Sequence, residues 1–200
     1  MNRFLQPEWL DELPATDEQA RHSRRDLQRL NWCMRHAQIA SGVLRSFDLN
    51  RKAPLLTDLG GGDGCFLLSV ARTLGSNWRG TRAVVVDRQR MIAPSTLAGF
   101  RDLGWEVEAV SRDVFDWCEE DAKEASSIVL TNLFLHHFDK EQLKQLLRGV
   151  SRRSSGFVAL EPRRTAWCVF FSKLVWMIGC NAVTRHDALV SVRAGFRGRE

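Results

Sequence analysis

The chain has 200 residues, a formal net charge of +5, 44% hydrophobic residues and 26% charged residues, an ordinary globular composition. This length predicts one domain stabilised by its own core, with no need of a disulfide or metal. The five cysteines are odd in number and none lies in a C-x-x-C pair, so we expect no disulfide framework, no zinc site and a reducing, cytoplasmic compartment. The mild charge does not favour a nucleic-acid partner.

Two segments bear on secretion and membrane insertion. No apolar run follows the N-terminal residues, so we expect no signal peptide. The longest apolar stretch, 166–180, is interrupted by Lys173 and is shorter than the about 20 residues that a membrane span needs.

The first 50 residues predict an amphipathic helical extension. Thr16 and Gln19 have the spacing of a capping box, so we expect a helix to begin there. Apolar residues then recur at helical spacing, at Leu27, Leu30, Met34, Ala37, Val43 and Leu44. The opposite face carries Arg21, Arg24, Arg25 and Arg29. That face is either a solvated surface or a cover that presents arginines to an anionic substrate.

From Pro54 onward, short apolar runs alternate with helical patterns. The apolar runs predict strands at 55–59, 83–87, 105–110, 127–132 and 156–161. The intervening segments predict helices at 65–74, 92–103, 117–125 and 140–151. Strand–helix alternation with nearly continuous apolar strands indicates an α/β fold, with a doubly wound, mostly parallel sheet covered by helices on both faces.

The segment between the first strand and the first helix of this region is rich in glycine. Glycines let the backbone turn tightly and approach a ligand closely, and the N-terminus of the next helix offers unpaired N–H groups. The dinucleotide pattern G-x-G-x-x-G fails here, because its third glycine would fall on Cys65. The observed pattern is an acidic residue followed by alternating glycines, at Asp58, Gly60, Gly62 and Gly64.

This glycine pattern resembles the first motif of the class I S-adenosylmethionine (SAM)-dependent methyltransferases of the small-molecule type. The resemblance implies a Rossmann-like fold and a SAM cofactor bound at the carboxyl ends of the strands. The alternative is a loop that serves only as a structural turn. The order of the later motifs along the chain agrees with the family.

Further carboxylates follow the next two strands. Asp87 ends the second strand, where the resemblance assigns it to the ribose hydroxyls of the cofactor. Asp113 and Val114 follow the third strand, where the family places an acid near the adenine amino group and an apolar side chain against the ring. Asp113 could instead cap the next helix. The candidate cofactor-binding residues are therefore Asp58, Gly60, Gly61, Gly62, Gly64, Asp87, Arg88, Asp113, Val114 and Asn132.

Two histidines follow the fourth strand, whose end should face the transferred methyl group. This segment resembles the plant phenolic O-methyltransferases, in which a catalytic histidine occupies the position of His136. A histidine titrates near neutrality and can take a phenolic proton, so His136 and, as a second choice, His137 are candidate catalytic residues. The alternative is that the pair only shapes the pocket. The sequence shows no third ligand, so we expect no metal site on the pair.

The resemblance implies that the loop from Glu161 to Arg164, after the fifth strand, borders the acceptor pocket. Residues 166–180 are apolar on nearly all sides. This pattern predicts one of three structures: a helix buried against the sheet, the wall of an apolar acceptor pocket, or a lid that contacts a membrane. Thr184 could cap a last helix.

In the family the sheet ends in two more strands that form a hairpin, and we see no residues for them after Phe196. We therefore expect the fifth strand to be an exposed edge.

We expect an N-terminal helical cap at 1–50, a SAM-binding core at 51–165 and a C-terminal helical segment at 166–200. The expected function is SAM-dependent methylation of a small, aromatic or lipid-like acceptor such as a phenol or quinol, with peripheral membrane contact through 166–180 as one option. An RNA or protein methyltransferase and a non-catalytic SAM-binding or scaffold protein are the alternatives.

Overall fold

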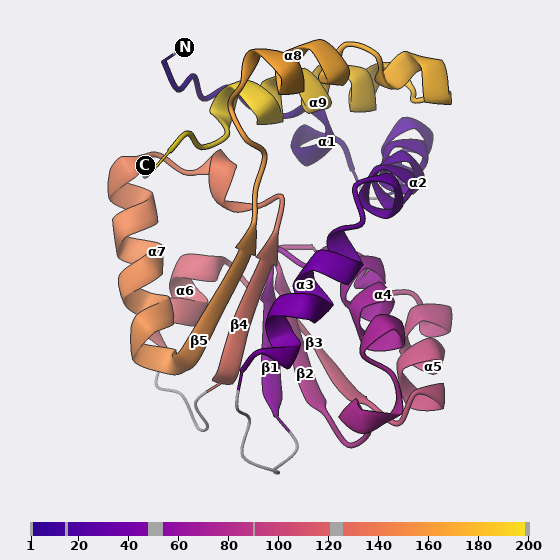
Figure 1. Ribbon diagram of the computed structural model, residues 1–200, viewed down its shortest axis with the longest axis vertical. Helices are drawn as coiled ribbons and strands as arrows, with labels where there is room; N and C mark the ends of the chain where they lie inside the picture. The colour runs from indigo at the N-terminus through magenta and orange to yellow at the C-terminus, as the bar shows by residue number, and fades with distance from the viewer. Residues whose placement is uncertain (1, 15, 48–53, 90, 121–125, 199–200) are drawn as a thin grey trace.

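The computed structural model is built around one parallel β-sheet (Figure 1). It describes the whole chain except residues 1, 15, 48–53, 90, 121–125 and 199–200. The described strands are β1 (Leu55–Leu59), β2 (Arg82–Asp87), β3 (Glu106–Ser111), β4 (Ser126–Asn132) and β5 (Ser154–Leu160). They pair in the order β3-β2-β1-β4-β5, and every pairing is parallel. The predicted doubly wound α/β fold is confirmed, and β5 is an edge of the described sheet.

The order of the strands fixes where a ligand can bind. The chain winds outward from β1 through β2 to β3, and β4 then returns to the other side of β1. Leu56 of β1 pairs with Ala83 of β2 on one side and with Ile128 of β4 on the other. The sheet therefore has its switch point between β1 and β4, and ligands of such sheets bind beyond the carboxyl ends of the strands at that point.

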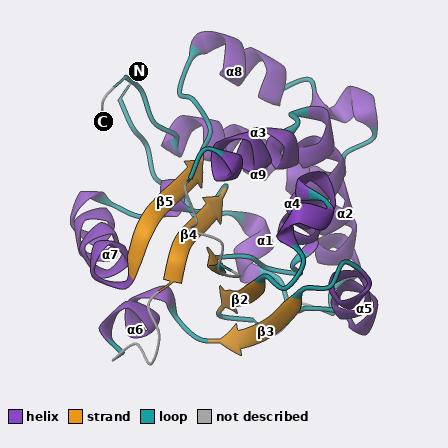
Figure 2. Cartoon of the chain, turned by 60° about the horizontal axis from the view of Figure 1, so that its bottom comes forward, coloured by secondary structure: helices purple, strands orange, loops and turns teal. Residues whose placement is uncertain are grey.

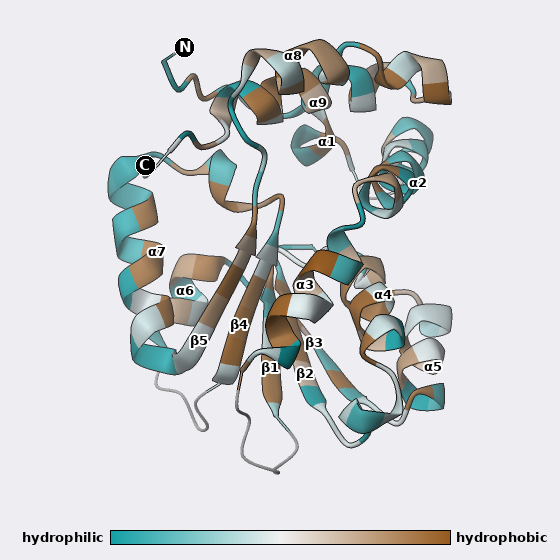
Figure 3. Ribbon diagram, viewed as in Figure 1, coloured by the Kyte–Doolittle hydropathy of each residue, from teal (hydrophilic) through white to brown (hydrophobic). Residues whose placement is uncertain are grey.

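Helices cover both faces of the sheet (Figure 2). One face carries α3 (His36–Arg45), α4 (Cys65–Leu74) and α5 (Pro94–Asp102), whose core includes Leu44, Leu67 and Phe100. The other face carries α6 (Val114–Glu119) and α7 (Lys140–Arg153), which pack Trp117 and Leu146 into a second core. Hydrophobic residues concentrate in the strands and in the helix surfaces that face them (Figure 3). Helix α3 belongs to the layer on the sheet, although it falls within the expected 1–50 cap.

A further layer lies beyond the carboxyl ends of the strands (Figure 1). It consists of α1 (Trp9–Glu12), α2 (Glu18–Cys33), α8 (Ala166–Ser172) and α9 (Ala182–Ala194), with α9 in contact with the other three. The two ends of the chain thus meet in this layer, where the N–H of Phe4 donates to the carbonyl of Arg193 over 3.3 Å.

The N-terminal helices differ from the expected single amphipathic helix. Asp17, not Thr16, caps α2, and its carboxylate accepts the N–H groups of Gln19 and Ala20. The helix breaks at Arg35, which has a left-handed φ of 55°. The buried face of α2 is polar, with Ser23 and Asp26 against α9, because this helix packs on another helix and not on the sheet. Met34 and Val43, which we expected on the apolar face, are exposed.

The C-terminal apolar stretch does not form a helix buried against the sheet. It forms α8 and a short 3-10 turn at Val175–Ile178, and its large apolar side chains are exposed. These are Trp167, Phe170, Phe171, Trp176, Met177 and Ile178. Among the described residues, no helix is long and apolar enough to cross a membrane.

Two helices begin at residues other than those expected. Asn181, not Thr184, caps α9 by accepting the Thr184 N–H over 2.8 Å. Helix α6 begins at Val114, ahead of the helix expected at 117–125, and residues 121–125 of that prediction lie outside the described residues.

Helix α7 approaches α6 closely at Gly149, so we expect a larger side chain at this position to destabilise the protein. A Cβ at Gly149 would lie 2.4 Å from Cβ of Cys118, so Gly149→Ala should destabilise the protein by about 1–3 kcal/mol through overpacking. Gly42 in α3 has open space around it, and Gly42→Ala should instead stabilise by up to about 1 kcal/mol through helix propensity. Urea unfolding of both variants measures this contrast, and a Gly149→Ala variant as stable as the wild type would contradict the packing.

Candidate functional site at the carboxyl ends of the strands

The glycine loop joins β1 to α4 by a tight turn that only glycine allows. The N–H of Gly60 donates to the carbonyl of Val86 in β2 over 2.8 Å, and φ is positive at Gly60, Gly62 and Gly64. A Cβ at Gly60 would lie 2.2 Å from the ring of Phe134. Both the backbone conformation and the lack of space therefore require glycine at this position.

Asp58 at the end of β1 is a buried acid without a partner. Neither of its carboxyl oxygens has a hydrogen bond among the described residues. Its Oδ2 lies against the loop, because a Cβ at Gly61 would approach it to 2.7 Å. Burial, and then the charges of Asp87 and Asp63, raise the pKa of Asp58 to about 8. A cation bound at the loop would remove this penalty by pairing with the carboxylate.

Asp87 holds the glycine loop from the neighbouring strand. Its Oδ2 accepts the N–H of Gly62 over 3.0 Å, and its Oδ1 accepts the N–H of Gln89 over 2.9 Å. Each carboxylate oxygen can accept a second hydrogen bond, so Asp87 retains capacity for ligand hydroxyls. The next residue, Arg88, accepts the hydroxyl of Ser111 at its backbone carbonyl.

The remaining cofactor candidates have structural contacts of their own. Asp113 caps α6 by accepting the N–H of Phe115 over 2.8 Å, which is the capping role we had weighed against adenine binding. Val114 is buried in the core between the sheet and α6. Asn132 accepts the Nδ1–H of His36 at 2.7 Å and donates to Asn31 at 3.2 Å, so it ties the end of β4 to the N-terminal helices.

The helical extension covers the loop directly. Gln28 of α2 donates to Oδ2 of Asp63, within the glycine loop, over 2.8 Å. Together with the contacts of Asn132, this bond places α2 above the switch point, and so the extension covers the carboxyl ends of β1 and β4.

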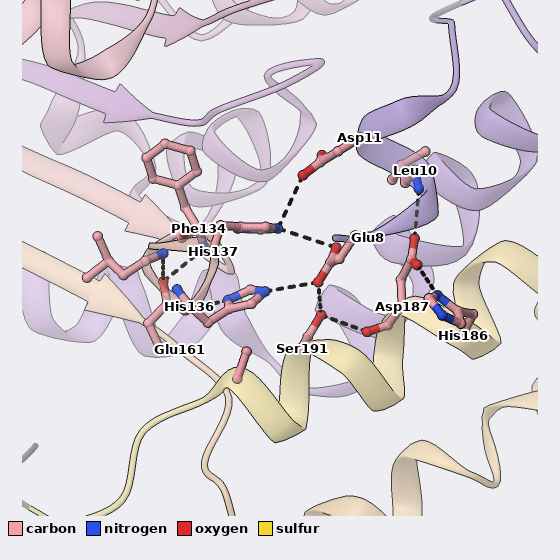
Figure 4. A network of polar contacts seen from close by, with 12 residues as sticks. Glu8, Leu10, Asp11, Phe134, His136, His137, Glu161, His186, Asp187 and Ser191 are labelled. Atoms are coloured by element: carbon pink, nitrogen blue, oxygen red, sulfur yellow. Dashed lines mark hydrogen bonds and ion pairs between the residues drawn. The ribbon is translucent and has the colours of Figure 1, made fainter. Parts of the chain in front are cut away.

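His136, in a 3-10 turn at Leu135–His137, is buried between two carboxylates (Figure 4). Its Nδ1–H donates to Oε2 of Glu161 over 2.7 Å. Its Nε2 faces Oε1 of Glu8, from the other end of the chain, at 3.1 Å. Oε1 of Glu161 also accepts the N–H groups of Phe134 and Leu135, so Glu161 fixes both the turn and the imidazole.

His137 faces the same carboxylate from the other side (Figure 4). Its Nδ1–H donates to the carbonyl of Phe134 over 2.8 Å. Its Nε2 lies 3.4 Å from Oε2 of Glu8 and 3.5 Å from Oδ2 of Asp11. The two imidazole centroids are 4.2 Å apart. One glutamate therefore stands between two histidines at the end of β4.

The carboxylates control the protonation of this pair. Burial alone would lower the pKa of His137, but the nearby carboxylates of Glu8 and Asp11 outweigh it and raise the pKa to about 9. The pKa of His136 is also raised, since the hydrogen bonds of Glu161 and Glu8 exceed the effect of burial. Conversely, the two histidines overcome the burial of Glu8 and hold its pKa far below its usual range.

Contacts from α9 and the N-terminal segment fix Glu8. The Ser191 hydroxyl donates to Glu8, and the carboxylate of Asp187 accepts the first N–H groups of α1, from Trp9 and Leu10, over 2.9 and 3.0 Å. Arg3 donates to the carbonyl of Phe138 over 2.8 Å, just beyond the histidine pair.

Sequence analysis did not include Glu8, Asp11 or Glu161 among the site residues. Glu161 had a detectable signal, because it directly follows β5 beside the end of β4. Glu8 and Asp11 had none, since their place depends on the folding of the chain ends together.

Comparison with known proteins supports the fold. No protein-family model matches the chain, and no curated protein matches it significantly. Among solved structures, the chain is similar to an O-methyltransferase family protein from Burkholderia thailandensis, with a TM-score of 0.53 and 18% identity, covering 93% of this chain and 55% of that one. It is also similar to a candidate O-methyltransferase from Nostoc punctiforme PCC 73102, with a TM-score of 0.51 and 18% identity, covering 86% and 47%.

These likenesses show that the chain has the Rossmann-like fold found in methyltransferases. The chain spans about half the length of both matched proteins.

The buried carboxyl group of Asp58 predicts a pH-dependent stability. The folded chain keeps the Asp58 proton up to about pH 8, whereas the unfolded chain releases it near its usual pKa of about 3.9. This group therefore stabilises the fold below about pH 4 and loses that contribution as pH rises to about 8. Asp58→Asn removes the effect, so its melting temperature relative to wild type should rise between pH 5 and pH 8.5. A difference that does not change with pH would contradict this assignment.

Proposed function

We propose that the chain binds SAM at the glycine loop and transfers its methyl group to a small, aromatic or lipid-like acceptor. The observation that carries the proposal is the carboxyl group of Asp58 beneath the loop, which has no hydrogen bond within the described part of the chain, with Asp87 at the tip of the adjacent strand. SAM carries a sulfonium and an ammonium group, which suit a buried carboxylate, and two ribose hydroxyls, which suit Asp87. The residues present therefore fit this cofactor.

The candidate cofactor-binding residues would each contribute a different type of contact. The loop from Gly60 to Gly64 would supply backbone N–H groups and space, and Asp58 would supply charge. Asp113 uses Oδ1 in its cap and keeps Oδ2 for the adenine amino group. Asn132 would act mainly by holding the covering helices in place, and Arg88 and Val114 stay candidates by position alone.

Bound SAM would supply an activated methyl group, and the protein would supply alignment and a pocket that excludes water. His136 is the proposed base for an acceptor hydroxyl, with Glu161 orienting it through Nδ1. A base needs a free, neutral nitrogen, and Nε2 of His136 faces Glu8. This role therefore requires the acceptor to displace Glu8 from His136. His137, whose Nε2 also faces Glu8, is the second candidate.

The exposed apolar side chains of 166–178 support an apolar acceptor or a membrane contact. Six large side chains of this segment, four of them aromatic, are exposed in the layer above the strands. Exposed apolar surface of this kind marks binding sites and membrane contacts. We propose that it receives an apolar acceptor, and, as a second role, that it touches a lipid surface.

Calorimetric titration with SAM and S-adenosylhomocysteine tests the cofactor assignment. We expect both to bind and NADH not to bind. Asp87→Ala should weaken SAM binding about 10-fold or more, because it removes charge-assisted hydrogen bonds. Asp102→Ala, on an exposed turn of α5, is the matched control and should bind as the wild type does. A folded wild-type chain that binds neither ligand would refute the proposal.

Turnover separates the enzyme from a SAM-binding scaffold. We expect methyl transfer to at least one member of a panel of phenols and quinols, and none to RNA or protein substrates. Cofactor binding without any turnover would favour the scaffold, and transfer to RNA or protein would favour the other enzyme class.

A further inference from the structure

We propose that Glu8, His136 and His137 form a binding site for a divalent transition metal of the zinc type, with Asp11 as a fourth ligand. The proposal does not rest on methyl transfer, and a metal bound at Nε2 of His136 would exclude that nitrogen as a base. Among the described residues, these three form the one group of histidine, cysteine and acidic side chains whose ligand atoms all lie within 4.8 Å of one another.

The orientation of both imidazoles is that of metal ligands. A histidine that binds a metal usually donates its other ring N–H to a carboxylate or a backbone carbonyl, which fixes the ring. His136 donates Nδ1–H to Glu161, and His137 donates Nδ1–H to the carbonyl of Phe134. Both Nε2 atoms are left to face Glu8, which comes from a distant part of the chain.

The distances fit a tetrahedral ion. Zinc bonds of about 2.0–2.1 Å to nitrogen and oxygen place neighbouring ligand atoms about 3.3 Å apart. The observed separations are 3.1 Å from His136 Nε2 to Oε1 of Glu8, 3.4 Å from His137 Nε2 to Oε2 of Glu8 and 3.5 Å from His137 Nε2 to Oδ2 of Asp11. Small side-chain adjustments would bring Glu8, His136 and His137 onto one ion, because their ligand atoms already lie within 4.8 Å of one another. Asp11, whose Oδ2 lies beside Nε2 of His137, would be the fourth ligand.

His137 gives a second, independent indication of a ligand. Its Nε2 is buried and has no hydrogen-bond partner among the described residues, because the two nearby carboxylates are too far or poorly aligned. A buried polar atom normally has a partner, and an atom without one indicates a missing ion or water. A metal between His137, Glu8 and Asp11 would supply that partner.

The charge of the cluster suits a divalent cation. The cluster sets two carboxylates, Glu8 and Asp11, against the Nε2 atoms of two imidazoles. A divalent cation among them would pair with both carboxylates, and neutral imidazoles would complete its ligands. Two imidazoles with one or two carboxylates favour zinc, cobalt or iron(II) over magnesium and calcium, which prefer all-oxygen sites.

The scaffold around the site is already in place. Ser191 and Asp187 of α9 fix Glu8 and the start of α1, and Glu161 fixes His136. A metal would join the N-terminal segment to the end of β4 and hold α1 over the crevice.

The test is equilibrium binding of Zn²⁺ to the metal-stripped full chain, without SAM or acceptor, by competition with a chelating dye. We expect one Zn²⁺ per chain and no competition from Mg²⁺. Glu8→Gln and His137→Ala should each weaken binding about 100-fold or more, and Glu161→Gln about 10–100-fold through loss of the orienting hydrogen bond. Glu12→Gln, an exposed acid in the same helix as Asp11, is the matched control and should bind as the wild type does.

Two further measurements keep the result unambiguous. Circular dichroism should show that Glu8→Gln is folded, and Co²⁺ should give the visible absorption of a tetrahedral ion without the near-ultraviolet band of a thiolate ligand. Equal Zn²⁺ binding by the Glu8→Gln and Glu12→Gln variants, binding that persists after replacement of both histidines, or a thiolate band would overturn the proposal. Because the cofactor is absent, these results are independent of the SAM titrations.

Discussion

The layer above the sheet depends on the buried carboxylate of Glu8. It faces two imidazoles at the end of β4 and the Ser191 hydroxyl of α9, so it joins three parts of the chain that are far apart in sequence. Removing one partner of a buried ion pair leaves an uncompensated charge, which costs about 3–5 kcal/mol. The N-terminal segment is therefore held where it is by electrostatics, since its helix α1 has no buried residue of its own.

Below this layer, the order of the strands determines where the candidate site lies. The strands β1 and β4 are nearly fully buried, and each carries a polar side chain at or next to its carboxyl end, Asp58 in β1 and Asn132 in β4. Parallel strands bring these ends to one edge, and the change in winding direction between β1 and β4 leaves room there for a ligand. The apolar strands thus provide stability, while one edge of the sheet carries the candidate site.

The fold could be predicted from local patterns, because strand runs, helix periodicity and the glycine loop are each contained in a few neighbouring residues. The predictions that were wrong about which side chains are buried share one physical cause, which is packing between distant segments. Helix α2 buries Ser23 and Asp26 because its neighbour is α9 and not the apolar sheet. The side chains of 166–178 are exposed because that segment lies above the strands and not against a sheet face.

The contrast between local patterns and packing of distant segments also separates the two parts of the candidate site, the glycine loop with Asp87 and the histidine pair. The loop and Asp87 follow from a motif and from the geometry of parallel strands, so sequence alone locates them. The histidine pair was also located, but its chemistry was not, since a histidine between two carboxylates differs from a free imidazole base. That difference is made by Glu8, 128 residues away from His136. The proposed cofactor side of this candidate site is therefore encoded locally, and its proposed acceptor side is created only when the chain ends meet.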